Sequence, residues 1–216
     1  MNEKFKIKDP VSALTHFIGF LLAIPILIVL VIKASQEATA WHVVSFAVFG
    51  VSLLLLYGAS TIYHTLSISD KCTKTLKRID HMMIFILIAG TYTPICLIPL
   101  RGTWGWTLFA LVWAFAIGGI LLKAFWLNAP RWFSTLLYVV MGWLVLIAFM
   151  PLEKAIPLGG IVLLAAGGIT YTLGAVIYAV KWPKIKSNVF GFHEIFHLFV
   201  MGGSLFHVLF MFQYIL

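Results

Sequence analysis

The sequence predicts an all-α, polytopic membrane protein in which seven transmembrane helices form one bundle. The first observation is composition: the 216 residues are 62% hydrophobic and 10% charged, whereas soluble domains are about half apolar and about a quarter charged. The mean hydropathy of +1.05 agrees. The second observation is that the apolar residues are gathered into seven long runs. A soluble chain of this size could not bury so much apolar surface, so lipid must cover much of it.

Each run is close to or longer than the ~20 residues that a helix needs to cross the hydrocarbon core. Runs of this length exclude a membrane barrel, whose strands are about ten residues long and alternate in polarity. We therefore expect one helical domain over residues 1–216. The expected spans are Ala13–Ile32, His42–Leu66, Ile79–Leu100, Trp104–Lys123, Trp132–Met150, Pro157–Val180 and Phe192–Leu216.

The basic residues are distributed unevenly between the two sides of such a bundle. Twelve lysines and arginines fall in the N-terminal tail and in alternate loops, whereas Lys33, Arg101 and Lys154 fall on the other side. Because positively charged loops stay in the cytoplasm, we expect a cytoplasmic N-terminus and an external C-terminus. Tryptophans near the predicted helix ends fit interfacial anchors: Trp41, Trp104, Trp106, Trp132 and Trp182.

The net charge of +8 is therefore interpreted as a topology signal facing anionic lipid, and no nucleic-acid partner is expected. The two cysteines, Cys72 and Cys96, form no metal-binding spacing, and no disulfide is expected between them. No cleaved signal peptide is expected either, because the first apolar run is long for one and six more follow it.

Ionisable side chains at membrane depth are costly and are therefore functional candidates. Of the seven acidic residues, only Asp80 and Glu194 lie at the edges of predicted spans. With a cytoplasmic N-terminus, the first, second, third and seventh helices all place polar residues at their cytoplasmic ends. These residues are His16, His64, Asp80, His81, His193 and His197.

His193 and His197 are four residues apart, so they lie one turn apart on one face of a helix. One helix can supply two zinc ligands at this spacing. His64 is the candidate third ligand, which would leave a fourth position open for water. We expect Asp80 to act as a base or to orient that water. Ser60, one turn before His64, could donate a hydrogen bond to a developing oxyanion.

Other interpretations of these residues remain open. The segment from His193 to His197 also fits the H-E-x-x-H pattern of zinc peptidases, in which Glu194 would be the general base. Glu194 lies, however, about 100° around the helix from His193. His42, at the outer end of the second helix, is expected to be an interfacial residue. Three further histidines could either pack against the bundle or serve the site: His16, His81 and His207.

Short motifs recur along nearly the whole chain. The most specific is the run Ala89-Gly90-Thr91-Tyr92-Thr93-Pro94. The others are Leu14-Thr15-His16, Ser60-Thr61-Ile62-Tyr63-His64, Arg78-Ile79-Asp80-His81, and His193-Glu194-Ile195-Phe196-His197 followed by Gly202-Gly203-Ser204. In these motifs the sequence resembles the haemolysin III family, the bacterial branch of the progestin and adipoQ receptor (PAQR) superfamily.

The resemblance implies a seven-helix protein of the bacterial inner membrane with Zn²⁺ near the cytoplasmic side. It implies that His64, His193 and His197 bind the zinc and that Asp80 lies near the zinc-bound water. Asp9 stands where relatives often carry a longer acid. The superfamily includes alkaline ceramidases, which implies hydrolysis of a lipid amide. The family's naming implies haemolytic or pore-forming activity, and some members are linked to membrane homeostasis.

Three functional hypotheses follow. The first is a zinc-dependent hydrolase of a ceramide-like amide, or a lipid-sensing relative of one, with membrane lipids as its partners. The second is a haemolysin with a structural zinc site. It would need a homo-oligomer to form a pore, because the predicted helices carry no polar stripe. The third is a receptor that changes shape when lipid enters and has no turnover.

Overall fold

The computed structural model of the protein describes residues 7–126, 128–185, 187 and 190–216. Helices make up most of these residues, and this part of the chain contains no strand. The predicted seven-helix membrane bundle is confirmed, because seven stretches are long and apolar enough to cross a membrane. The elements are α1 (Pro10–Glu37), α2 (Ala40–Thr65), α3 (Asp70–Leu97), α4 (Thr103–Phe125), α5 (Arg131–Gly142), the 3₁₀ helix η1 (Leu144–Ala148), α6 (Phe149–Ala155), α7 (Leu158–Val180), α8 (Phe192–Phe210) and the π-helical turn η2 (Met211–Ile215).

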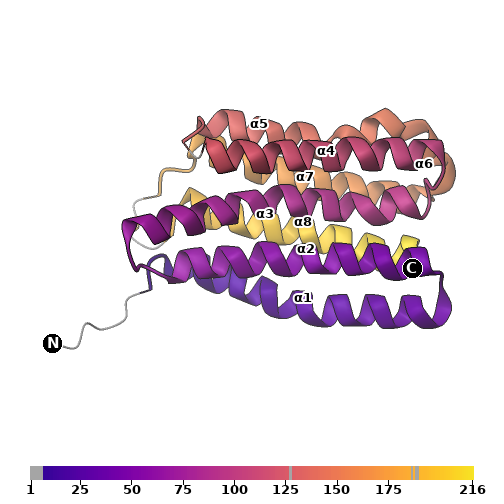
Figure 1. The fold of residues 1–216 in the computed structure, drawn as a ribbon, viewed down its shortest axis with the longest axis horizontal. Helices are drawn as coiled ribbons and strands as arrows, with labels where there is room; N and C mark the ends of the chain where they lie inside the picture. The colour runs from indigo at the N-terminus through magenta and orange to yellow at the C-terminus, as the bar shows by residue number, and fades with distance from the viewer. Residues whose placement is uncertain (1–6, 127, 186, 188–189) are drawn as a thin grey trace.

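The helices run along the long axis of the molecule, and the start of α1 and the C-terminus lie at opposite ends of the bundle (Figure 1). We call the end that holds the starts of α1, α3, α5 and α8 the N-terminal end. Neighbours in sequence pack together from α1 to α4, and α8 closes the bundle by packing on both α7 and α1. The first and last spans therefore lie side by side.

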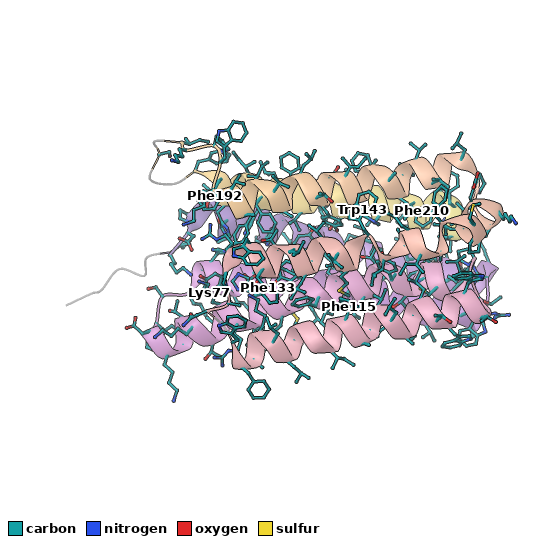
Figure 2. The ribbon with its side chains drawn as sticks, turned by 90° about the horizontal axis from the view of Figure 1, so that it is seen from above. Lys77, Phe115, Phe133, Trp143, Phe192 and Phe210 are labelled. Atoms are coloured by element: carbon teal, nitrogen blue, oxygen red, sulfur yellow. The ribbon has the colours of Figure 1, made fainter. Side chains whose placement is uncertain are left out.

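The interior of the bundle is aromatic and aliphatic, and its surface is apolar as well. Phe46, Phe49 and Phe85 are almost completely buried, whereas Leu14 and Leu173 are exposed. Side chains line the helices along their whole length, with Lys77 and Phe192 toward the N-terminal end and the buried Phe210 toward the other (Figure 2). An apolar exterior of this kind is suited to lipid. The tryptophans expected as anchors are exposed at helix ends: Trp41, Trp104, Trp106, Trp132 and Trp182.

Helix α3 begins earlier than its apolar run predicts. It starts at Asp70 instead of near Ile79, and the Ser69 hydroxyl caps it by accepting a hydrogen bond from the Cys72 backbone N–H at 3.3 Å. The added turns are polar, so an apolar window misses them, although a serine cap is a good helix start. Asp80 and His81 consequently lie about three turns inside α3, and not in its first turn as the sequence predicted. Cys72 and Cys96 are both free, as expected.

The fifth span is broken near its middle, where a continuous helix was expected. The α-helix ends at Gly142, a 3₁₀ turn follows, and α6 completes the crossing. Tyr92 of α3 bridges the break: its hydroxyl donates to the Gly142 carbonyl at 2.7 Å and accepts from the Val145 backbone N–H at 2.8 Å. In a membrane such a break is tolerated where other groups pair the freed backbone.

Candidate metal site

Three imidazole rings from two distant helices meet at the N-terminal end of the bundle. His64 lies in the last turn of α2, and His193 and His197 lie in the first turns of α8. One nitrogen of each ring lies within 4.8 Å of the others, and His64 and His197 are buried. The sequence predicted this grouping from the spacing of the α8 pair and a shared depth. The structure thus brings the three predicted ligands together.

The spacing of the rings fits a small divalent cation. Zinc binds imidazole nitrogens at about 2.0–2.1 Å in a tetrahedral arrangement, which places two such nitrogens about 3.3 Å apart. The Nε2 atoms of His64 and His193 are 3.3 Å apart. The ring of His197 lies 5.0 Å from that of His64 and 4.6 Å from that of His193, centroid to centroid. Three neutral imidazoles with no carboxylate among them form a donor set typical of zinc.

Asp9, which directly precedes α1, orients His64. Its Oδ2 lies 2.9 Å from His64 Nδ1, and its backbone N–H donates to the His64 carbonyl at 2.9 Å. A carboxylate can only accept, so Nδ1 carries the proton and Nε2 is left with its lone pair toward the other histidines. Carboxylates commonly fix metal-binding histidines in this way. The family resemblance drew attention to Asp9 as an acid near the first helix, but the sequence left open whether it reaches the site.

Lys8 fixes Asp9 in turn. Its ammonium lies 3.4 Å from Asp9 Oδ2, donates to the Tyr63 carbonyl at 3.1 Å and lies 3.3 Å from the centre of the Tyr63 ring. Burial lowers the pKa of Lys8 below its ordinary value, and the neighbouring Asp9 carboxylate opposes this shift. The two residues therefore form a strap that joins the chain before α1 to the end of α2.

Residues of α1 contact the third ligand. The ring of His16 stacks on that of His197, with centroids 3.6 Å apart and planes 10° from parallel. Both ring nitrogens of His16 are buried without a hydrogen-bond partner among the described residues. Thr15 Oγ1 lies 3.4 Å from His197 Nδ1 and donates to backbone carbonyls of its own helix. It can therefore accept from Nδ1–H, which leaves Nε2 of His197 for a metal.

Both carboxylate oxygens of Glu194 are hydrogen-bonded to groups other than the three histidines. Its Oε1 accepts a hydrogen bond from the Ser12 hydroxyl at 2.6 Å, and its Oε2 accepts from the Gly191 backbone N–H at 2.7 Å. The carboxylate thus caps the first turn of α8 and ties that turn to α1. This use of Glu194 weighs against the peptidase interpretation of the H-E-x-x-H segment, in which the glutamate must reach the reacting water.

Asp80 and Ser60 line the same cavity as His193 and His197. Asp80 is buried in α3, and no ion pair reaches it from any residue that the structure describes. Ser60 of α2 is also buried, and its hydroxyl lies close enough to interact with the Asp80 carboxylate. Both groups are thus positioned to interact with a bound molecule. Their catalytic roles stay predictions.

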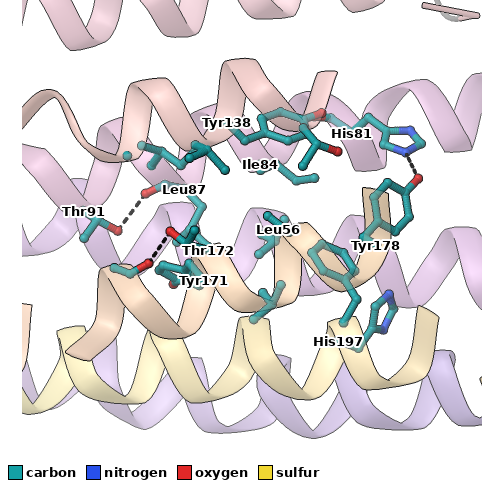
Figure 3. A pocket seen from close by; sticks show the side chains of 18 of the residues that line it. Leu56, His81, Ile84, Leu87, Thr91, Tyr138, Tyr171, Thr172, Tyr178 and His197 are labelled. Atoms are coloured by element: carbon teal, nitrogen blue, oxygen red, sulfur yellow. Dashed lines mark hydrogen bonds between the residues drawn. The ribbon is translucent and has the colours of Figure 1, made fainter. Parts of the chain in front are cut away.

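A narrow, mainly apolar cavity leads from the histidines into the bundle. Its volume is about 130 Å³, which equals the liquid volume of about four water molecules at roughly 30 Å³ each. His197, Tyr178 and His81 lie at one end of it, Thr91, Tyr171 and Thr172 at the other, and Leu56, Ile84 and Leu87 lie between them (Figure 3). An apolar cavity whose mouth carries polar side chains matches the two parts of an amphiphile.

The other histidines are placed at three different depths. His81 lies at the cavity mouth, where its Nδ1 donates to the Lys77 carbonyl at 2.8 Å and its Nε2 lies 3.5 Å from the Tyr178 hydroxyl. His207 lies deep in the cavity. His42 lies in the first turn of α2, at the opposite end from the three histidines, and is half-buried beside Thr39. This position agrees with the interfacial role expected for His42.

Comparisons with a family model and with individual proteins identify the same family. A family model described as "Haemolysin-III related" matches residues 5–208. The chain is 47% identical to the "Hemolysin-3" of Bacillus cereus, over 93% of this chain and 89% of that protein. It is 48% identical to the "Hemolysin-3 homolog" of Bacillus subtilis (strain 168), over 93% and 91%. The human "Monocyte to macrophage differentiation factor" is 25% identical over 83% and 71%. The chain therefore belongs to the haemolysin III family of multi-pass membrane proteins, which is related to the PAQR proteins.

Proposed function

We propose that this protein is a zinc-dependent membrane hydrolase that cleaves the amide of an acyl lipid similar to ceramide. The observation that carries the proposal is that His193 and His197 lie on the wall of one apolar cavity that Asp80 and Ser60 also line, with His64 beside them. A polar lipid group at the histidines and an acyl chain in the channel would together match both parts of this site. The same geometry would also suit a lipid sensor without turnover.

The residues around the cavity mouth can divide the work of hydrolysis. Zinc, when bound, supplies polarisation of a carbonyl and activation of water. Asp80 is the candidate to take the proton of the attacking water and return it to the leaving amine. The Ser60 hydroxyl, which lies beside Asp80, is the candidate to donate to the developing oxyanion. The apolar walls exclude other water from the reacting group.

The proposal includes a location and an orientation. The bacterial relatives support a bacterial membrane, and we propose the inner membrane with the N-terminal end of the bundle toward the cytoplasm. Lysines and arginines are concentrated at that end, as cytoplasmic loops require. The lipid amide would then be drawn from the inner leaflet.

Hydrolysis of a fluorescent ceramide analogue by purified, zinc-loaded protein tests the proposal. We expect turnover that a zinc chelator stops and added zinc restores, and no turnover by His197→Ala. His42→Ala is the matched control, because His42 lies outside the cavity, and it should retain the unaltered rate. Hydrolysis that survives both the chelator and His197→Ala would reject the zinc mechanism. A zinc-loaded protein that binds the analogue without cleaving it would favour the sensor.

A membrane-permeabilising function is the second candidate, and the names of the Bacillus relatives favour it. The cavity within one chain is narrow and mainly apolar, so a water-filled pore would require several copies of the chain. Leakage of a dye from liposomes would distinguish the candidates. Leakage that rises steeply with protein concentration, and that His197→Ala does not change, would support a pore with a structural metal site.

A further inference from the structure

A second cavity continues the first toward the opposite end of the bundle. Its volume is about 100 Å³, and its walls are mainly aliphatic and aromatic. Six residues line both cavities, and we call this shared ring the waist. It consists of Thr91, Tyr92, Gly142, Trp143, Gly168 and His207. The break between α5 and η1 lies in this ring, so irregular backbone occurs where two cavities meet.

His207 presents an unpaired acceptor at the waist. Its Nδ1 lies 2.7 Å from the Gly203 carbonyl, which can only accept, so Nδ1 carries the proton and Nε2 has the lone pair. The hydrogen bond from Nδ1 is the one that His207 makes within the described chain, and none reaches Nε2. The ring cannot easily turn away, because it stacks on Tyr171 with centroids 5.3 Å apart. On another side it lies directly over Gly167, where a Cβ would be 2.4 Å from the ring.

The neighbouring polar groups of the waist already have partners within the protein. Trp143 Nε1 donates to Thr172 Oγ1 at 3.0 Å, and Thr91 donates to the Leu87 carbonyl at 2.8 Å. The Tyr92 hydroxyl both donates and accepts at the helix break. The polar hydrogens of these groups are thus engaged within the protein, whereas His207 Nε2 is an acceptor that could receive a donor from a molecule inside the cavity. A buried acceptor without a donor costs about 1–3 kcal/mol, so a matching group in the ligand would be favoured.

We propose that the waist is a second polar subsite, where His207 Nε2 accepts a hydrogen bond from a hydroxyl group part-way along a bound acyl chain. The walls are apolar on both sides of the waist, so the donor must be small and flanked by hydrocarbon. A hydroxyl group meets both conditions. His207 is ten residues beyond His197 on α8, about 15 Å at 1.5 Å per residue. The proposal rests on the proposed function in one respect, namely that an acyl chain occupies the cavity.

Competition binding to the purified, zinc-loaded protein in detergent micelles tests the subsite. Stearic acid, 2-hydroxystearic acid and 12-hydroxystearic acid would each displace a fluorescent fatty acid. With its carboxylate at the histidines, only the 12-hydroxy acid carries its hydroxyl to the depth of His207. We expect this acid to bind about 5- to 10-fold more tightly than stearic acid, as one hydrogen bond would give. The 2-hydroxy acid should show no advantage that depends on His207.

Two substitutions test whether tighter binding of the 12-hydroxy acid depends on His207. His207→Leu should remove the advantage of the 12-hydroxy acid and leave the affinity for stearic acid within about twofold, since only one hydrogen bond is lost. His207→Gln keeps an acceptor and should retain part of the advantage. His42→Leu is the control, because His42 lies far from the waist, and it should change neither affinity. If a His207 variant does not fold, the relative affinities of the three acids for the unaltered protein still test the subsite.

The outcomes separate this subsite from the proposed function. Equal binding of stearic and 12-hydroxystearic acids by the unaltered protein would overturn the subsite alone, since water would then satisfy Nε2. An advantage that persists in folded His207→Leu would overturn it as well. Failure of every acid to displace the probe would also remove the acyl-chain occupant on which the proposed function depends.

Discussion

The main cavity has a histidine with a hydrogen-bonded Nδ1 at each end, but the surroundings of the two Nε2 atoms differ. At the mouth, Nδ1–H of His64 donates a hydrogen bond to a carboxylate from a distant segment, Asp9, and two further imidazoles converge on its Nε2. At the waist, Nδ1–H of His207 donates a hydrogen bond to the carbonyl of Gly203, in its own helix, and no other imidazole of the described residues approaches its Nε2. The number of converging imidazoles is therefore what distinguishes the candidate metal site from the proposed hydrogen-bonding subsite.

Removing one of the three converging imidazoles should have the largest effect, because it should disrupt zinc binding at the mouth. We expect His197→Ala to weaken zinc binding. The loss of affinity should exceed the roughly 10- to 100-fold that is typical when only a group that orients a ligand is removed. Zinc content of the purified protein, measured by mass spectrometry after dialysis, gives the result. His207→Ala is the matched control and should retain zinc, since it lies outside the group of three. Equal zinc in the two variants would mean that the three histidines do not form the metal site.

Removing the carboxylate that orients His64 should have the next largest effect. We expect Asp9→Ala to weaken zinc binding by about 10- to 100-fold, because the His64 ring loses its fixed tautomer and orientation. Competition with a zinc-binding dye measures this affinity. Asp70→Ala is the control, since Asp70 is exposed at the start of α3. An unchanged affinity in Asp9→Ala would show that the strap does not act on the metal site.

The next prediction concerns the break in the fifth span, which lies at the waist. Tyr92→Phe removes a hydroxyl that pairs both the Gly142 carbonyl and the Val145 N–H. Each unpaired buried group costs about 1–3 kcal/mol, so the unfolding free energy should fall by a few kcal/mol. Thermal unfolding and hydrogen exchange at residues 142–145 would report the loss. Tyr214→Phe is the control, because no hydrogen bond to the Tyr214 hydroxyl is present in the described chain. Equal effects of the two changes would contradict the bridging role of Tyr92.

A smaller effect is expected from two adjacent glycines of α7. In Gly167→Ala the new Cβ would lie 2.4 Å from the His207 ring, whereas in Gly168→Ala it would lie 3.7 Å from Trp143, an ordinary contact. Overpacking of this kind costs about 1–3 kcal/mol, so Gly167→Ala should lower the midpoint of thermal unfolding. Gly168→Ala should be nearly neutral. Zinc binding should be unchanged in both variants, and a loss of zinc in Gly167→Ala would mean that the waist and the mouth are coupled.

The membrane bundle and the three histidines could be predicted because each depends on a local pattern. An apolar run of sufficient length defines a span wherever it packs. Two histidines four residues apart share a helix face before any tertiary contact is known, and topology then places His64 at the same end. The start of α3 was missed for the same reason, because its first turns are polar and only the cap at Ser69 marks them.

The contacts that complete the site could not be predicted, because they join segments that are far apart in sequence. Asp9 and His64 are separated by 55 residues, and only the packing of α1 on α2 brings them together. The stacking of His16 on His197 joins the first and last spans in the same way. The break after Gly142 has no sequence signal of its own, since the residue that bridges it, Tyr92, belongs to another helix.

The strap before α1 has a practical consequence for handling this protein. A chain trimmed to begin at Pro10 would keep all seven spans, and its helical content would look normal by circular dichroism. It would nevertheless lack the acceptor for His64, so its affinity for zinc should fall as it does in Asp9→Ala. Trimming from the opposite terminus would leave Asp9 and its contact with His64 in place.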